Sequence, residues 1–219
     1  MRKQRPRGTI TRDAVVSAGL LVADRDGVEQ LTIRAVADQV GAAPMSLYAY
    51  FENKEDLLDL MFVEIAGLMY AYQAHPTWQE ELLALGNRVH GLLTVHPNWA
   101  ALLSRPVAPL AVPLREEVLK LMVADGIPAT DAWMGLSAVI FTAIGPVLVK
   151  ATLNGQSGSG IDKRFNRLKE WVDTPAGRAN LKTHAALKEV PEFKPDLVFQ
   201  FTLRALITGL EALRAPPAR

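Results

Sequence analysis

Residues 31–51, LTIRAVADQVGAAPMSLYAYF, constrain the fold of this chain more than any other stretch. Thr32 is a good N-cap, and the residues after it repeat the apolar spacing of one helix face. These residues are Ile33, Val36, Ala37 and Val40. Gly41 can adopt the positive φ of a tight turn, and Pro44 suits the first turn of a new helix because its missing N–H would have no partner there. The stretch predicts a helix, a glycine turn and a short second helix.

The rest of the chain also has a helical pattern, without alternating apolar and polar runs bounded by hairpin turns. A first helix is expected from the N-cap Thr11 to the residue before Gly27. Asn53 is the expected N-cap of a fourth helix, long enough to join two parts of the chain rigidly. We predict helices at about 12–26, 33–40, 44–50, 54–74, 78–95, 97–104, 112–125, 128–153, 161–172, 175–188 and 195–213. The expected fold class is all-α.

Charge is unevenly distributed along the 219 residues, although the net charge is only +1. Five basic residues occur before the first acid, Asp13, and they are Arg2, Lys3, Arg5, Arg7 and Arg12. A short basic arm on a near-neutral body suits contact with phosphate better than with an acidic small substrate. A merely solvated N-terminus is the open alternative.

Cysteine is absent, which excludes disulfides, thiolate metal sites and a cysteine nucleophile, and is compatible with an intracellular location. The N-terminus lacks the apolar segment of a secretory signal, so we expect a cytoplasmic protein. Residues 132–149 are uncharged and reach the lower edge of a membrane span. Because they include Gly135, Thr142 and Pro146, a buried core or interface helix is the better interpretation, and no membrane contact is expected.

Residues 31–51 have the pattern of a helix-turn-helix, in which the first helix lies across the phosphate backbone and the second enters the major groove. Leu47 and Phe51 would anchor the second helix, leaving its other side chains toward DNA. The candidate DNA contacts are Thr32, Arg34, Pro44, Met45, Ser46, Tyr48, Ala49, Tyr50 and Lys54. Two ordinary packed helices would show a similar pattern, but the basic arm and the exposed hydroxyl and aromatic groups favour DNA.

Residues 9–60 resemble the N-terminal domain of the tetracycline-repressor (TetR) family of bacterial regulators. The string LTIRAVADQVGAAPMSLYAYFENKEDLLDLM carries the resemblance, most clearly at 31–34, 40–41, 47–48, 51 and 53–58. The resemblance implies an N-terminal three-helix helix-turn-helix domain, a homodimer with two heads about 34–36 Å apart and an operator with two-fold symmetry.

The C-terminal part is similar to the subclass that contains the tetracycline repressor. The similarity lies in Ser104-Arg105-Pro106, in 136–148 and in the last helix around Phe201 and 209–211. It implies a homodimer through helices at about 128–150 and 195–213, paired as a four-helix bundle. The subclass places a magnesium-ligating histidine just before its Thr-Arg-Pro, and this chain has no histidine at 101–106. We therefore expect no metal and no cofactor.

The sequence offers no set of residues in a pattern typical of an enzyme, so we do not expect catalytic activity. His75, His90, His96 and His184 show no metal-ligand spacing, and residues 155–160 lack the Lys-Ser/Thr of a P-loop. The C-terminal part is instead rich in large apolar groups that can surround an apolar cavity, although most are expected to be plain core. The candidate ligand contacts are Asn87, His96, Trp99, Arg105, Trp133, Phe141 and Thr142.

We therefore expect a DNA-binding domain at 1–56 and a ligand-binding and dimerisation domain at 57–219. The predicted function is a ligand-responsive transcriptional regulator, a repressor that a small apolar or amphipathic molecule releases from operator DNA. Two alternatives stay open. One is an activator or co-repressor-dependent regulator of the same fold, and the other is an all-α ligand-binding module without DNA binding.

Overall fold

The computed structural model describes residues 10–71, 75–103, 105, 113, 115–154, 167, 170–180 and 195–214, and every regular element in these ranges is helical. The all-α prediction is confirmed. The elements are α1 (Arg12–Asp26), α2 (Ile33–Val40), α3 (Pro44–Leu47), α4 (Lys54–Met69), α5 (Trp78–Val95), the 3-10 helix η1 (Pro97–Trp99), α6 (Ala100–Leu103), α7 (Glu116–Ala124), α8 (Ala129–Asn154), α10 (Pro175–Asn180) and α12 (Pro195–Glu211).

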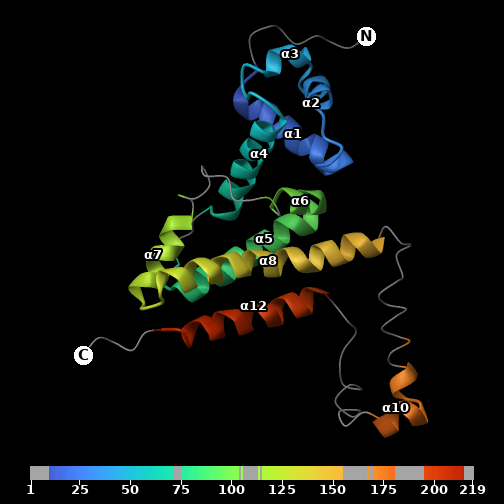
Figure 1. Ribbon diagram of the computed structural model, residues 1–219, viewed down its shortest axis with the longest axis vertical. Helices are drawn as coiled ribbons and strands as arrows, with labels where there is room; N and C mark the ends of the chain where they lie inside the picture. Colours follow the sequence, from blue (N-terminus) through green and yellow to red (C-terminus); the bar gives the residue numbers. More distant parts are fainter. Residues whose placement is uncertain are drawn as a thin grey trace.

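The head of the molecule consists of α1, α2, α3 and the start of α4 (Figure 1). Three predicted side-chain caps begin its longer helices. Thr11 Oγ1 accepts from Ala14 N at 3.1 Å, and Thr32 Oγ1 accepts from Ala35 N at 3.1 Å. Asn53 Oδ1 accepts from the backbone of the first turn of α4, also at 3.1 Å. Each cap satisfies an amide that has no partner within the helix.

The turn between α2 and α3 depends on Gly41, whose φ of 74° and ψ of 37° lie in the left-handed region. Its N–H donates to Asp38 O, and the N–H of Ala42 donates to Ala37 O. These bonds satisfy carbonyls at the end of α2, as expected for a left-handed helix end. The predicted glycine turn is confirmed.

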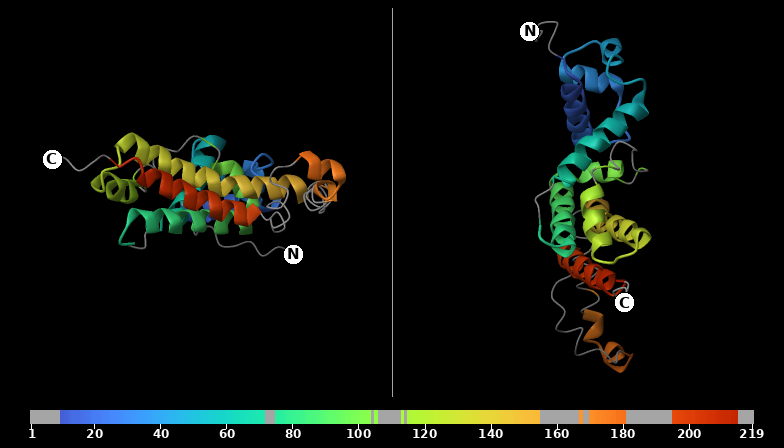
Figure 2. Two further views of the ribbon diagram at one scale, coloured as in Figure 1. Left: turned by 90° about the horizontal axis from the view of Figure 1, so that it is seen from below. Right: turned by 90° about the vertical axis from the view of Figure 1, so that its left-hand side faces the viewer.

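The body is built around α8, which packs against both α5 and α12. Figures 1 and 2 show α8 and α12 lying side by side, with α4 running from the head down to this layer. Glycines allow the close approach: a Cβ on Gly135 would lie 2.6 Å from Leu210, and one on Gly86 would lie 2.8 Å from Leu203. The leucine side chains of α12 therefore pack directly against the backbone of α5 and α8 at these glycines.

α8 is the one helix in the described ranges that is long and apolar enough to cross a membrane, by length and composition alone. Its inner face is core: Leu136, Val139 and Ala143 are fully buried. This burial supports the interpretation of residues 132–149 as a core or interface helix.

Several predicted helices are shorter in the structure. α3 ends at Leu47 instead of Tyr50, because the N–H of Tyr50 bonds to Leu47 O in a tighter i to i−3 turn. α4 ends at Met69 instead of residue 74, and α7 begins at Glu116 instead of residue 112. Most of the predicted helix at 161–172, and residues 181–188, lie outside the described residues.

Head and body share one hydrophobic core that runs from Val15 in α1 to Leu210 in α12. A second contact joins η1 to α1. Trp99 Nε1 donates to Leu20 O at 3.4 Å, Asn98 Nδ2 donates to Asp24 O at 2.7 Å, and His96 Nδ1 lies 3.0 Å from an Asp24 carboxylate oxygen. The head is thus attached to the body both through α4 and through η1.

Candidate DNA-reading head and ligand cavity

The short helix α3 presents an exposed surface on two buried anchors. Leu47 is 0% exposed and Phe51 is 6% exposed, which confirms their predicted anchoring role. On the opposite side Met45 is 77% exposed and Tyr48 is 45% exposed. The smaller residues Pro44, Ser46 and Ala49 are also exposed. This surface is at the end of the molecule farthest from α12 (Figure 1).

The hydroxyls of Ser46 and Tyr50 already have partners inside the head. Ser46 Oγ donates to Ala43 O at 2.6 Å. Tyr50 is half-buried, and its hydroxyl donates to Ile10 O at 2.6 Å, just before α1. Tyr50 therefore holds α1 against the end of α3, and the expected orientation of its hydroxyl toward DNA is not found. Sequence reasoning missed this bond because its partners are 40 positions apart.

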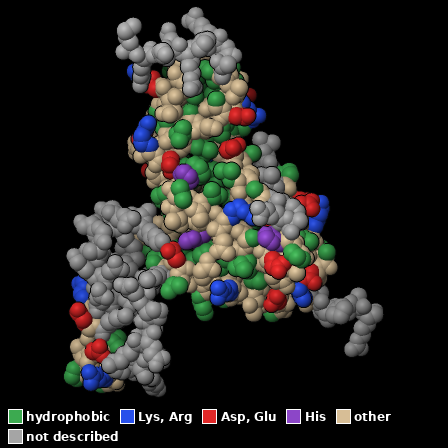
Figure 3. Space-filling view, turned by 180° about the vertical axis from the view of Figure 1, so that it is seen from behind, with side chains coloured by type: hydrophobic (Ala, Val, Ile, Leu, Met, Phe, Trp, Pro, Cys, Tyr) green, Lys and Arg blue, Asp and Glu red, His purple; other side chains and the backbone are tan. Residues whose placement is uncertain are grey.

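The remaining candidate DNA contacts flank α3. Thr32 and Arg34 are exposed at the start of α2, which packs against α3, and Lys54 is half-buried at the start of α4. Thr32 uses its oxygen as a cap. On the face shown in Figure 3, basic and acidic side chains are interspersed among the described residues.

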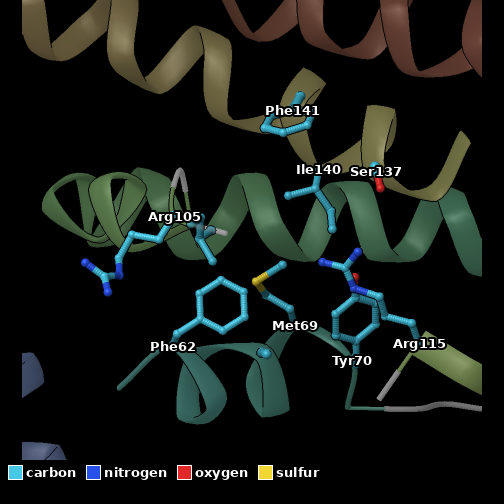
Figure 4. A pocket seen from close by; sticks show the side chains of 10 residues that line it. Phe62, Met69, Tyr70, Arg105, Arg115, Ser137, Ile140 and Phe141 are labelled. Carbon is cyan, nitrogen blue, oxygen red and sulfur yellow. The ribbon is translucent and has the colours of Figure 1, made fainter. Parts of the chain in front are cut away.

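An apolar cavity lies where α4, α6, α8 and the start of α7 meet (Figure 4). Its volume is about 60 Å³, so a ring-containing ligand would have to displace side chains. The lining comprises Phe62, Ala66, Met69, Tyr70, Leu103, Arg105, Arg115, Ser137, Ile140 and Phe141. An apolar lining with few polar groups is typical of a small-molecule site.

Arg115 is the most unusual residue of this cavity. It is 5% exposed, its Nε has no hydrogen-bond partner, and no ion pair joins it to a carboxylate in the described part of the chain. Its guanidinium carbon lies 5.0 Å from the ring centre of Trp133 and 5.8 Å from that of Tyr70. The Tyr70 hydroxyl is also buried without a partner. Burial raises the pKa of Tyr70 to about 12, against the opposing effect of Arg115, so the hydroxyl stays neutral at neutral pH.

Arg105 lines the same cavity but directs its guanidinium away from Arg115 (Figure 4). Its Nη2 lies 2.6 Å from a Glu55 carboxylate oxygen and 3.6 Å from one of Asp59. Both acids belong to the first half of α4, next to the head. One side chain therefore borders the cavity and also contacts the helix that carries the head.

Of the seven predicted ligand contacts, Arg105 and Phe141 line this cavity. Trp133 contacts it only through Arg115. The other four predicted residues do not line it. His96 and Trp99 stack on each other in the contact with α1, and Asn87 Oδ1 accepts from Gln200 of α12. Thr142 is half-buried on α8 and is not among the lining residues.

Sequence reasoning missed Phe62, Met69, Tyr70 and Arg115. Phe62 and Met69 belong to the second half of α4 and Tyr70 directly follows it, in a stretch whose sequence pattern is that of an ordinary amphipathic helix. Arg115 directly precedes Glu116 and Glu117 in the sequence, and no local pattern there indicates that its side chain is buried. Those two acids instead pair with Lys120.

An apolar face of α8 and α12 stays exposed in the single chain. Phe141 is 64% exposed and Met134 is 55% exposed on α8, while Phe201 is 74% exposed and Leu197 is 52% exposed on α12. An exposed apolar patch of this kind on a helical body is typical of a protein interface. We call these four residues the α8–α12 face.

Comparison with known proteins gives a consistent result. Residues 15–61 match the family described as bacterial regulatory proteins, tetR family. An HTH-type transcriptional regulator from Saccharopolyspora erythraea is 32% identical over 163 residues, 73% of this chain and 69% of that protein. The HTH-type transcriptional repressor DrrR1 from Streptomyces coeruleorubidus is 31% identical over 221 residues, 96% of this chain and 80% of that protein.

Among solved structures, the TetR family protein ActR from Streptomyces coelicolor in complex with actinorhodin has a TM-score of 0.74 and 22% identity. The alignment covers 94% of this chain and 98% of ActR. This likeness shows a shared fold over nearly the whole length of both chains.

Proposed function

Because the chain belongs to the tetR family of bacterial regulatory proteins, we propose that it is a transcriptional repressor whose binding to operator DNA is controlled by a small molecule. The observation that carries the proposal is the combination of an exposed α3 on buried anchors with a cavity bordered by the same helix, α4, that joins the head to the body. Relatives named as a transcriptional regulator and a repressor support it.

For the DNA contacts, we propose that α3 enters the major groove with its exposed face. Met45 and Ala49 suit contact with thymine methyl groups, while Tyr48 and Arg34 suit phosphates or base edges. Thr32, Pro44, Ser46 and Lys54 complete the contact surface. Few of these groups can make bidentate base contacts, so DNA shape contributes to specificity.

For assembly, we propose a homodimer through the α8–α12 face, corresponding to the sequence ranges of about 128–150 and 195–213. The exposed apolar side chains on both helices support this pairing. A two-fold dimer would place two heads on an operator of matching symmetry, with half-sites about 34–36 Å apart. The division at residues 56 and 57 then separates DNA binding from ligand binding and dimerisation, in a protein of the cytoplasm.

For control, we propose that ligand binding in the cavity moves Arg105 relative to Glu55 and Asp59 and so changes the tilt of α4. The ion pairs from the cavity wall to the first half of α4 support this route. For this, the ligand must have a higher affinity for the conformation whose heads do not fit the operator than for the conformation that binds DNA. A coupling of about 1–3 kcal/mol would change operator affinity by about 5–150-fold.

The test begins with selection of bound DNA from a random pool, followed by gel-shift titration of the selected sequence. Arg34→Ala and Tyr48→Ala should each weaken binding by about tenfold while unfolding at the wild-type temperature, because both side chains are exposed. Arg25→Ala is the matched control, since Arg25 is exposed on α1 and pairs only with Asp26. Wild-type affinity in both variants contradicts the assigned contacts, and failure to select any DNA contradicts the proposed function.

A further inference from the structure

We infer that the cavity binds a ring-containing small molecule that carries a carboxylate, with Arg115 as the residue that pairs with this carboxylate. The inference rests on the proposed function, because it names the chemical class of the effector. It depends on the guanidinium of Arg115, which is buried at the cavity and pairs with no carboxylate among the residues that the structure describes.

A buried guanidinium without a carboxylate partner is costly, since a charge removed from water needs pairing to recover its hydration energy. Two aromatic rings contact Arg115 and give only partial compensation. Its Nε–H still lacks an acceptor. Arginine presents its donors in a planar fork that fits a carboxylate with two parallel hydrogen bonds. Within the described part of the chain, no carboxylate completes this site.

The other polar groups of the cavity favour the same ligand charge. Arg105 is a second cation in the lining, and no Asp or Glu is among the described lining residues. A cationic ligand would meet the charge of Arg115, which pairs with no acid among the described residues, whereas Arg105 is already paired with Glu55 and Asp59. The neutral Tyr70 hydroxyl, buried without a partner beside Arg115, can donate one more hydrogen bond to a carboxylate oxygen. Figure 4 shows the guanidinium and this hydroxyl turned toward each other below α8.

The rest of the lining specifies the body of the ligand. Phe62, Met69, Leu103 and Ile140 offer apolar contacts, and Phe141 borders the cavity with a 64% exposed ring. Aromatic and thioether side chains pack favourably against flat rings. The small free volume means that entry displaces flexible side chains such as Met69. A flat apolar carboxylic acid would pair with the guanidinium of Arg115 and pack its ring against the apolar side chains of the cavity.

The experiment compares matched acids and amides on the full-length protein: benzoate with benzamide, 2-naphthoate with 2-naphthamide, and 9-anthroate with its amide. Binding is measured by calorimetry and by the shift in unfolding temperature. We expect at least one acid to bind about ten- to hundredfold more tightly than its amide. Equal affinities within every pair, or no binding of any acid, would overturn the inference.

Arg115→Met keeps the length of the side chain and removes the charge. We expect it to reduce acid affinity to that of the amide and to unfold at or above the wild-type temperature without ligand, because an unpaired buried charge is lost. Arg115→Lys should keep part of the acid preference, and Tyr70→Phe should lose a smaller part. Arg25→Met is the control and should bind acids as wild-type does. Unchanged acid binding in Arg115→Met contradicts the assignment.

Operator binding is measured separately on the same variants. Arg115 lies in the body, so Arg115→Met should hold the selected DNA normally. If wild-type protein prefers acids but binds no DNA, the proposed function fails and the inference about the cavity stands. If it binds DNA but shows no acid preference, only the inference fails.

Discussion

At the scale of single residues, Gly41 shows how backbone conformation determines where the reading helix lies. Its φ of 74° is a conformation that L-residues adopt only at a cost. Gly67 lies in the middle of α4, and a Cβ there would meet nothing within 4 Å. Glycine is therefore favoured at position 41 by the backbone conformation, whereas at position 67 a side chain can replace it without strain or a clash.

Gly41→Ala should lower the free energy of unfolding by about 1 kcal/mol, because alanine would be held in the left-handed region. Gly67→Ala should raise it by about 0.5–1 kcal/mol, because alanine favours the helix interior. Thermal and urea unfolding measure both. The same sign for the two substitutions would contradict the conformational argument.

Local signals in the sequence predicted the residues that define the head. Thr11, Thr32 and Asn53 were identified as caps because capping depends on neighbours three positions away. The hydrogen bond of Tyr50 inside the head and the burial of Arg115 at the cavity were not predicted. Their roles depend on Ile10, Tyr70 and Trp133, which are distant in sequence and become neighbours only after folding.

At the scale of helices, periodicity predicted the existence of most elements and their order but not all of their ends. The inner face of α8 could be inferred from its uncharged run, yet its partners α5 and α12 could not. The packing of these helices depends on complementary shape: Gly86 of α5 and Gly135 of α8 leave room for leucine side chains of α12. The sequence contains no local signal for such a fit.

The α8–α12 face leads to a prediction at this scale. Phe201→Glu should convert the proposed dimer to a monomer, because it places a carboxylate among the exposed apolar side chains of the α8–α12 face. The monomer should stay helical, since Phe201 is 74% exposed in the single chain. Light scattering after size exclusion measures the mass, and circular dichroism measures the helix content.

Val95→Glu is the matched control for this substitution. Val95 is 70% exposed at the end of α5, outside the proposed dimer contact. It should leave the mass unchanged. A dimer that persists in Phe201→Glu would mean that another surface joins the two chains.

At the scale of the whole molecule, the cavity and the head are connected by the ion pairs of Arg105 with Glu55 and Asp59. Replacing the acids by Glu55→Gln and Asp59→Asn together should leave binding of an aromatic acid to the cavity unchanged. The effect of that acid on operator affinity should shrink severalfold, because this route of coupling is lost. Calorimetry measures the first quantity and gel shift with and without acid the second.

Glu64→Gln provides the control, as Glu64 is exposed farther along α4. It should release operator in response to acid as wild-type does. Undiminished release in the double variant would assign the coupling to the packing of α4 alone or to the contact between η1 and α1.

The length of α4 has a mechanical consequence. A straight helix of 16 residues is about 24 Å long, so a tilt of about 10° about its cavity end moves its other end by about 4 Å. In a two-fold dimer the two displacements are related by the symmetry axis, so the distance between the heads would change by up to about twice that amount, against a groove repeat of about 34–36 Å. Under the proposed mechanism α4 would act as a lever, in which a small side-chain movement at the cavity produces a larger displacement of the head relative to the DNA groove.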